Sequence, residues 1–154
     1  MMAGKVAVAM SGGVDSAVAA YLLREKGYET VGITMCLGVA DQPGSKVKCC
    51  GPQEIEDARR VCDLLEIPHY VMDFSGDLEE CVIAPFIREY RRGRTPNPCV
   101  DCNRHIKFGV LMEKALAMGF DYLATGHYAG LSAVDGRPVM AVSRDPRKDQ
   151  TYFL

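Results

Sequence analysis

Short apolar runs that alternate with segments of helical periodicity constrain the fold of this chain more than any other feature. The apolar runs cover residues 5–10, 30–36, 69–74 and 121–125. The helical segments that follow them cover residues 17–26, 53–65, 77–92 and 106–118, and Pro85 predicts a kink or a break in the third. This alternation is typical of a parallel sheet with helices on both faces. We therefore expect an α/β fold, built as a three-layer open parallel sheet.

Two more strand-like runs follow, at residues 128–134 and 138–142. Asp135-Gly136 joins them, and an Asp-Gly pair favours a hairpin turn. We expect a small β element appended near the C-terminal end. The length of 154 residues and a hydrophobic content of 48% fit one domain with a single core.

The overall charge and the cysteine content exclude several classes of protein. A formal net charge of −2 argues against a uniformly basic nucleic-acid binder, so RNA binding needs a local patch. No stretch resembles a secretory signal or reaches the ~18 apolar residues of a membrane span, so we expect a cytoplasmic protein that does not enter membranes. The 7 cysteines are an odd number, which argues against a disulfide framework and favours packing, metal binding or sulfur chemistry.

The motif SGGVDS lies between the first strand and the first helix. Gly12 and Gly13 allow backbone N–H groups to point at a phosphate at a helix N-terminus, and Ser11 and Ser16 add hydroxyl donors. Asp15 is a candidate ligand for a Mg²⁺ ion between the loop and a nucleotide. The motif has neither the lysine of GxxxxGK[ST] nor the spacing of GxGxxG. A tight glycine turn without a ligand is the alternative interpretation.

SGGVDS resembles the signature of the ATP pyrophosphatase superfamily, whose fold is of the adenine-nucleotide alpha hydrolase type. Its members split ATP between the α and β phosphates and adenylate a carbonyl or carboxylate oxygen. The resemblance implies that ATP is held by Ala9, Met10, Ser11, Gly12, Gly13, Val14, Asp15 and Ser16. Open α/β sheets bind ligands where the strand order reverses, so we expect the fourth strand beside the first, with Gly126 and His127 near the nucleotide. For His127, an ordinary histidine at a strand end is the alternative.

A second motif, RRGRTPNPCVDCNRHIKF, covers residues 91–108. Pro96 and Pro98 predict a stiff, extended loop. We expect a helix to begin near Asn103, immediately after Cys102, so that the helix dipole and nearby cations favour a nucleophilic thiolate at Cys102. Such a thiolate suits the ATP site, because a uracil oxygen that carries AMP can leave when sulfur attacks.

The same motif is rich in cations. We expect a local patch suited to an RNA backbone from Arg91, Arg92, Arg94, Arg104 and Lys107. An ordinary solvated helix end is the alternative interpretation.

Together with SGGVDS, the segments TPNPCVDCNRHIKF, DYLATGHYA and KDQTYFL resemble the N-terminal domain of the tRNA-specific 2-thiouridylases over essentially the whole chain. These enzymes modify the wobble uridine. The resemblance implies that Cys102 is the nucleophile, that Met35 and Gly126 line the ATP pocket, and that the substrate is tRNA. It also implies a partner protein that delivers persulfide sulfur. Implied tRNA contacts are Asn97, Pro98 and Cys99 with the target base, and His127, Lys148, Asp149 and Gln150 with the rest of the tRNA.

The chain departs from the pattern of this family in two ways. Cys99 stands where many members carry aspartate. The second cysteine that the family uses downstream lies beyond Leu154, as do its central domain and its C-terminal β-barrel. We therefore expect residues 1–154 to be a truncated ATP pyrophosphatase domain that lacks full thiolation activity.

The remaining cysteines allow a metal hypothesis. Cys49 and Cys50, with Cys99 and Cys102, would supply four thiolates to an iron–sulfur cluster or zinc, although metal-free loop thiols are the alternative. The cysteines within regular elements, Cys36, Cys62 and Cys81, are predicted to pack in the core. Two other functions stay open: a different adenylating enzyme such as an amide-forming synthetase, which leaves Cys102 unexplained, and a non-enzymatic redox or metal-binding module, which leaves SGGVDS unexplained.

Overall fold

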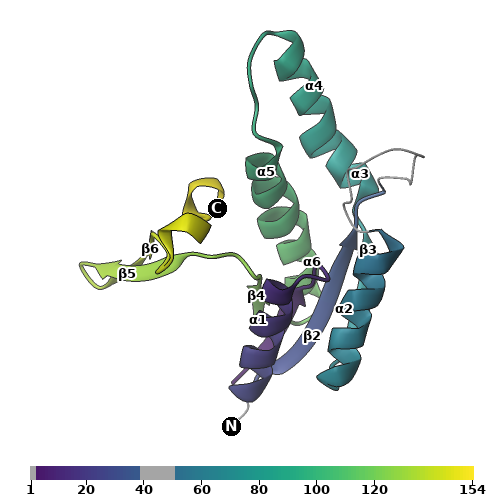
Figure 1. Ribbon diagram of the computed structural model, residues 1–154, viewed down its shortest axis with the longest axis vertical. Helices are drawn as coiled ribbons and strands as arrows, with labels where there is room; N and C mark the ends of the chain where they lie inside the picture. Colours follow the sequence, from purple (N-terminus) through teal and green to yellow (C-terminus); the bar gives the residue numbers. More distant parts are fainter. Residues whose placement is uncertain (1–2, 39–50) are drawn as a thin grey trace.

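The computed structural model describes residues 3–38 and 51–154. Its centre is a parallel sheet of four strands in the order β3-β2-β1-β4 (Figure 1). The strands are β1 (Lys5–Ala9), β2 (Glu29–Cys36), β3 (His69–Asp73) and β4 (Tyr122–Ala124). The predicted α/β class and the predicted position of the fourth strand beside the first are confirmed, since β1 pairs with both β2 and β4.

Alternate residues of β1 face two separate hydrophobic layers. Val6 and Val8 pack with α1 (Val14–Glu25) and α2 (Pro52–Leu64) on one face, through Ala20, Ala58 and Cys62. Ala7 faces the opposite layer, where the largest fully buried side chains include Phe74, Ile33, Ile106 and Leu111. The central strand β1 is thus buried on both sides, as expected for parallel strands joined by helical crossovers.

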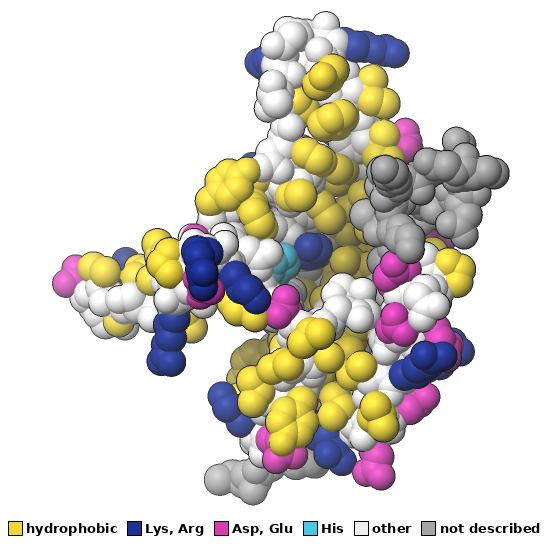
Figure 2. Space-filling model, in the orientation of Figure 1, with side chains coloured by type: hydrophobic (Ala, Val, Ile, Leu, Met, Phe, Trp, Pro, Cys, Tyr) yellow, Lys and Arg dark blue, Asp and Glu magenta, His cyan; other side chains and the backbone are white. Residues whose placement is uncertain are grey.

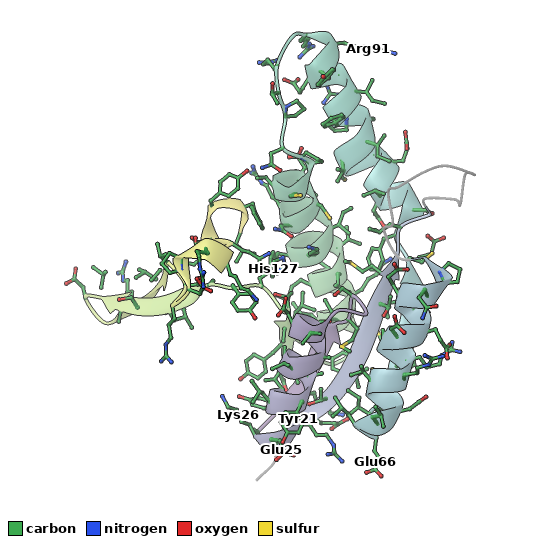
Figure 3. The ribbon with its side chains drawn as sticks, viewed as in Figure 1. Tyr21, Glu25, Lys26, Glu66, Arg91 and His127 are labelled. Carbon is green, nitrogen blue, oxygen red and sulfur yellow. The ribbon has the colours of Figure 1, made fainter. Side chains whose placement is uncertain are left out.

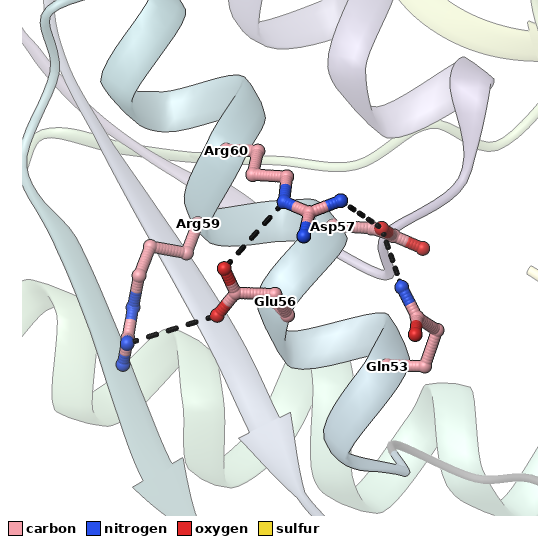
Figure 4. Close-up of polar contacts among 5 residues, drawn as sticks. All are labelled: Gln53, Glu56, Asp57, Arg59 and Arg60. Carbon is pink, nitrogen blue, oxygen red and sulfur yellow. Dashed lines mark hydrogen bonds and ion pairs between the residues drawn. The ribbon is translucent and has the colours of Figure 1, made fainter.

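The outer face of α2 carries a network of polar contacts between neighbouring turns (Figure 4). The pairs are Glu56 with Arg59 and Arg60, Asp57 with Arg60, and Gln53 with Asp57, at 2.9–3.9 Å. Exposed pairs of this kind contribute only about 0.3–0.5 kcal/mol each. The helix is therefore held mainly by its buried face.

A helical rod follows β3 and rises past the end of the sheet (Figure 1). It consists of α3 (Ser75–Leu78), η1 (Glu79–Ile83) and α4 (Ala84–Arg91), without a break. Pro85 therefore neither splits nor ends the helix. The segment that precedes it has π-type hydrogen bonding, a change of register that accommodates the N–H that proline lacks.

A second rod returns toward the sheet and contains α5 (Pro98–Asp101), η2 (Cys102–Leu111) and α6 (Met112–Ala117). The prediction of a helix start near Asn103 is wrong, because the rod begins at Pro98. Asn97 caps it: the Cys99 backbone N–H donates to Asn97 Oδ1 at 3.0 Å. Proline at the first helical position after an Asn cap is a recognised start signal.

The predicted appended β element is an antiparallel hairpin of β5 (Gly130–Val134) and β6 (Arg137–Ala141) that extends away from the sheet (Figure 1). Its turn residues Asp135 and Gly136 have φ angles of 51° and 73°, as the predicted Asp-Gly turn requires. Short 3-10 turns, η3 (Pro146–Lys148) and η4 (Thr151–Phe153), bring the C-terminal end back beside α5. No helix in the described residues combines the length and apolarity of a bilayer span.

Candidate functional site

The SGGVDS loop is closed on itself by serine hydroxyls at the carboxyl end of β1. Ser16 Oγ donates to the Gly13 carbonyl at 3.0 Å, and the Ser11 backbone N–H donates to Ser16 Oγ at 3.2 Å. Gly12 has a φ of +76°, and a Cβ there would lie 2.5 Å from the Glu54 carbonyl oxygen at the start of α2. The loop therefore requires glycine at this position for both conformation and space.

Gly126 brings the chain after β4 against the first turn of α1. A Cβ at this residue would lie 2.6 Å from the Ser16 backbone nitrogen and 2.8 Å from the Asp15 carbonyl carbon. Only a residue without a side chain allows this approach. The contact joins the two segments that the sequence predicts to share a nucleotide.

A cavity of about 230 Å³ lies at the carboxyl ends of β1, β2 and β4. Figure 2 shows a hollow at the centre of this face, with histidine and Lys or Arg side chains in it. Its described lining residues are Ala9, Met10, Ser11, Asp15, Ser16, Met35, Lys107, Thr125, Gly126, His127 and Gln150.

This lining brings together most residues that the sequence analysis assigns to ATP. Gly12, Gly13 and Val14 lie in the same loop but are not among the lining residues. His127 and Gln150, which the resemblance assigns to tRNA, share the cavity. Lys107 and Thr125 were not predicted for it. A lysine within the helix after the proline loop carries no local signal for a distant cavity, whereas Thr125 ends a strand that was already placed there.

His127, whose position Figure 3 shows, contacts two polar side chains of the cavity. Its Nδ1 is 2.8 Å from Thr125 Oγ1, and its Nε2 is 3.4 Å from Lys107 Nζ. Burial, and next the Lys107 charge, lower the pKa of His127 to about 4. The imidazole is therefore neutral at neutral pH: Nε2 accepts from the Lys107 ammonium, and Nδ1–H donates to Thr125.

This depressed pKa predicts a loss of stability in acid. The ordinary histidine pKa is 6.5, so the unfolded chain takes up a proton on His127 before the folded chain does. The stabilising contribution is complete above pH 6.5 and is lost as the pH falls toward 4, by less than about 1.4 kcal/mol per pH unit because the side chain is only half-buried. We expect chemical denaturation at pH 7 and pH 4.5 to show a smaller acid loss in His127→Gln than in wild type. Equal losses would contradict the assignment. His69→Gln should change the acid loss in the same direction, since burial also lowers the pKa of His69.

Asp15 is held by a residue far away in the sequence. The Tyr128 hydroxyl donates to Asp15 Oδ1 at 2.8 Å, and this bond and the Asp15 charge raise the pKa of Tyr128. Tyr128 is itself fixed by Gln150, whose Oε1 accepts from the Tyr128 backbone N–H at 2.8 Å. Lys148 Nζ lies 5.1 Å from the Tyr128 ring centroid. Two residues predicted to contact tRNA, Lys148 and Gln150, thus contact Tyr128, which in turn contacts the SGGVDS loop.

The proline loop is tied to the same C-terminal segment. Asn97 Nδ2 donates to the Tyr152 hydroxyl, and Asn103 Nδ2 donates to the Phe153 carbonyl at 2.8 Å. Cys99 is exposed, whereas Cys102 is half-buried and packs against the core layer that contains Phe74. Neither thiol is among the residues that line the cavity. Because the rod begins at Pro98, Cys99 rather than Cys102 lies in its first turn, and the expected dipole effect on Cys102 loses its basis.

The predicted cationic patch is divided. Lys107 belongs to the cavity, while Arg91, at the tip of α4, is remote from it (Figure 3). Glu89 partly neutralises two others, since its carboxylate pairs with Arg94 at 2.6 Å and Arg92 at 3.3 Å.

The metal hypothesis depends on residues outside the described part of the chain, because Cys49 and Cys50 lie there. Within residues 3–38 and 51–154, no group of three or more His, Cys, Asp or Glu residues is arranged to hold a metal ion. The packing role predicted for Cys62 is confirmed: it is fully buried, and burial raises the pKa of its thiol to about 11. Cys36 and Cys81 are half-buried, and Cys81 packs against the core.

Comparison with known proteins adds independent information. A family model described as the tRNA methyl transferase HUP domain matches residues 4–154. The chain is 60% identical over 150 residues to tRNA-specific 2-thiouridylase MnmA 1 of Syntrophus aciditrophicus, covering 97% of this chain and 40% of that protein. It is 54% identical over 152 residues to tRNA-specific 2-thiouridylase MnmA of Clostridium botulinum (strain Eklund 17B), covering 97% and 42%. The chain thus spans about two fifths of the length of these curated relatives.

Among solved structures, the fold is similar to the crystal structure of a predicted subunit of tRNA methyltransferase from Methanocaldococcus jannaschii. The TM-score is 0.54 at 22% identity, over 83% of this chain and 54% of that one. This likeness supports the three-layer fold.

Proposed function

Since the chain belongs to the family described as the tRNA methyl transferase HUP domain, we propose that it is the ATP-binding part of a tRNA-uridine 2-sulfurtransferase. The observation that carries the proposal is the cavity at the carboxyl ends of β1 and β4, where the SGGVDS loop meets Gly126. Open α/β sheets bind nucleotides at such a reversal of strand order. The 2-thiouridylase names of relatives at 54–60% identity support the choice of acceptor.

In this proposal, the loop and the N-terminus of α1 bind the ATP phosphates. The C2 oxygen of a uridine attacks the α-phosphorus and pyrophosphate leaves, so the oxygen becomes part of a good leaving group. The terminal sulfur of a persulfide then attacks C2, and AMP departs with the oxygen. A second thiol attacks the remaining sulfur–sulfur bond, so that a disulfide forms and one sulfur stays on C2. The SGGVDS loop has no lysine to favour γ-phosphoryl transfer, which supports cleavage between the α and β phosphates.

Asp15 is the one carboxylate among the described lining residues of the cavity. A Mg²⁺ ion in a nucleotide site takes one or two protein carboxylates and completes its shell with phosphate oxygens and water. Asp15 fits that requirement and would hold such an ion, which would neutralise phosphate charge. The hydrogen bond from Tyr128 holds the carboxylate at the N-terminus of α1.

We assign the tRNA to the surface formed by the proline loop and the C-terminal segment. Asn97 and Asn103 hold that segment, and Gln150 connects it to the cavity. These contacts support a base bound at residues 97–99 close to the nucleotide. Cys102 is proposed as the nucleophile. A persulfide-carrying donor protein would supply sulfur, and the family's central and β-barrel domains would lie in sequence outside residues 1–154. tRNA as substrate agrees with the cytoplasmic location expected from the sequence.

The proposal predicts that the whole protein releases pyrophosphate, and not phosphate, from ATP when tRNA is present. We expect Asp15→Ala to reduce this release by about 100-fold or more, because positioning of the phosphates is lost. A coupled pyrophosphate assay and a phosphate assay on the same samples measure it. Asp63→Ala, at an exposed acid on α2, is the control and should behave as wild type. Phosphate as the product, or an unaffected Asp15→Ala variant, would contradict the proposal.

A further inference from the structure

The nucleotide cavity contains a cation that does not come from its phosphate loop. Among its described lining residues, Lys107 is the only cation and Asp15 the only acid. Lys107 is half-buried and belongs to η2, on the rod that packs on the face of the sheet opposite α1. The SGGVDS loop and Lys107 therefore approach the cavity from different layers of the fold.

The electrostatics of the cavity demand such a cation. ATP brings several negative charges, while Asp15 adds one more on the side of α1. The α1 N-terminus supplies only about half a positive charge, and no Lys or Arg occurs between Lys5 and Arg24. The Mg²⁺ ion proposed at Asp15 would compensate charge on the side of α1. Compensation from the opposite side falls to Lys107, the cation among the described lining residues.

His127 fixes where the ammonium lies. Its Nε2 accepts from Lys107 Nζ at 3.4 Å, and Thr125 Oγ1 engages the other ring nitrogen at 2.8 Å. Because both nitrogens have partners, the ring is held from two sides. A neutral imidazole takes up one of the three N–H bonds of the ammonium and leaves the others for a ligand. The low pKa of His127 keeps the ring neutral, so that it does not repel the lysine.

We infer that Lys107 contacts the phosphate oxygens of the bound nucleoside triphosphate, and that His127 is a positioning residue that aims its ammonium into the cavity. This inference rests on the proposed function and deepens it by naming the group that compensates the phosphate charge. The phosphate-binding lysine then lies on a helix after the proline loop and not in the SGGVDS loop. The ammonium also offsets the charge that develops on departing pyrophosphate; no proton transfer is involved.

Calorimetric titration of the whole protein with a non-hydrolysable ATP analogue and, separately, with adenosine tests the inference. We expect Lys107→Met to weaken binding of the ATP analogue by about 10- to 100-fold, the usual effect of a lost charge-assisted hydrogen bond. Adenosine affinity should stay within about twofold of wild type, because the nucleoside has no phosphate. Lys26→Met removes an exposed cation at the far end of α1 and should change neither affinity (Figure 3).

The role of His127 has its own readout. His127→Leu removes the acceptor and should lower the affinity for the ATP analogue toward that of Lys107→Met. His127→Gln keeps an acceptor and should retain most of the wild-type affinity. The double variant Lys107→Met/His127→Leu should be no weaker than Lys107→Met alone, since both changes remove one interaction. Additive losses, or no rescue by glutamine, would overturn the positioning role.

The outcomes separate this inference from the proposed function. If wild type binds the ATP analogue and Lys107→Met binds it equally well, Lys107 is not the phosphate cation, although the ATP site stands. If Lys107→Met lowers the affinity for adenosine as well, the lysine supports the structure of the cavity and the inference is wrong. If wild type binds no ATP analogue, both the proposed function and the inference fail.

Discussion

Replacing Gly126 with alanine is expected to weaken ATP binding by about 100-fold while the chain remains folded. The added methyl group would lie 2.6 Å from the Ser16 backbone nitrogen and 2.8 Å from the Asp15 carbonyl carbon. Both are main-chain atoms that no rotamer change moves, so β4 and the first turn of α1 must separate. That turn presents the N–H groups proposed to bind phosphate, and a displacement of about 1 Å at such a site costs about 100-fold.

Affinity for a non-hydrolysable ATP analogue and thermal stability should both be measured for this variant. Overpacking of this kind costs about 1–3 kcal/mol, which leaves an ordinary domain folded. Gly76→Ala is the matched control, because it introduces the same methyl group in α3 with nothing within 4 Å and no positive φ. Retention of ATP affinity within about threefold in Gly126→Ala would show that this close approach does not shape the nucleotide site.

The fold was predictable because its signals are local. Periodicity identifies each strand and helix, and the strand order follows from one further premise, that ATGHYA and SGGVDS share a ligand at a reversal of strand order. The β1–β4 pairing of Val6 with Tyr122 confirms the predicted strand order. The start of the second rod also has a local signal, because Asn97-Pro98 is a cap followed by proline. The interpretation of this segment as a stiff loop did not use that signal.

The contents of the cavity were only partly predictable, because several of its contacts join residues that are distant in the sequence. Tyr128 and Asp15 are 113 residues apart, and Lys107 and His127 are 20 apart on different elements. A charged residue inside a helical motif predicts solvent exposure until the packing of that helix is known. For this reason the sequence predicts Lys107 in a surface patch. The packing of the rod instead places Lys107 in the lining of the cavity.

Replacing Cys102 with serine should abolish thiolation of tRNA by the whole protein, by a factor of roughly a thousand or more, and leave ATP binding intact. A hydroxyl is protonated at neutral pH and cannot form the sulfur–sulfur bond on which the proposed transfer depends, so the loss is one of chemistry rather than of affinity. ATP binding should persist because Cys102 is not among the residues that line the cavity. Measurement of 2-thiouridine in tRNA, with calorimetry for ATP, separates the two effects.

Cys81→Ser is the matched control, because Cys81 is half-buried and packs against the same core layer as Cys102, so it reports the cost of the substitution without a proposed role in catalysis. Cys99→Ser tests the competing thiol, which is exposed in the first turn of the rod. If thiolation survives in Cys102→Ser and is lost in Cys99→Ser, the nucleophile is the thiol at the helix start. The position of Cys99 at the start of the rod, and not the family resemblance that points to Cys102, would then identify the reactive thiol.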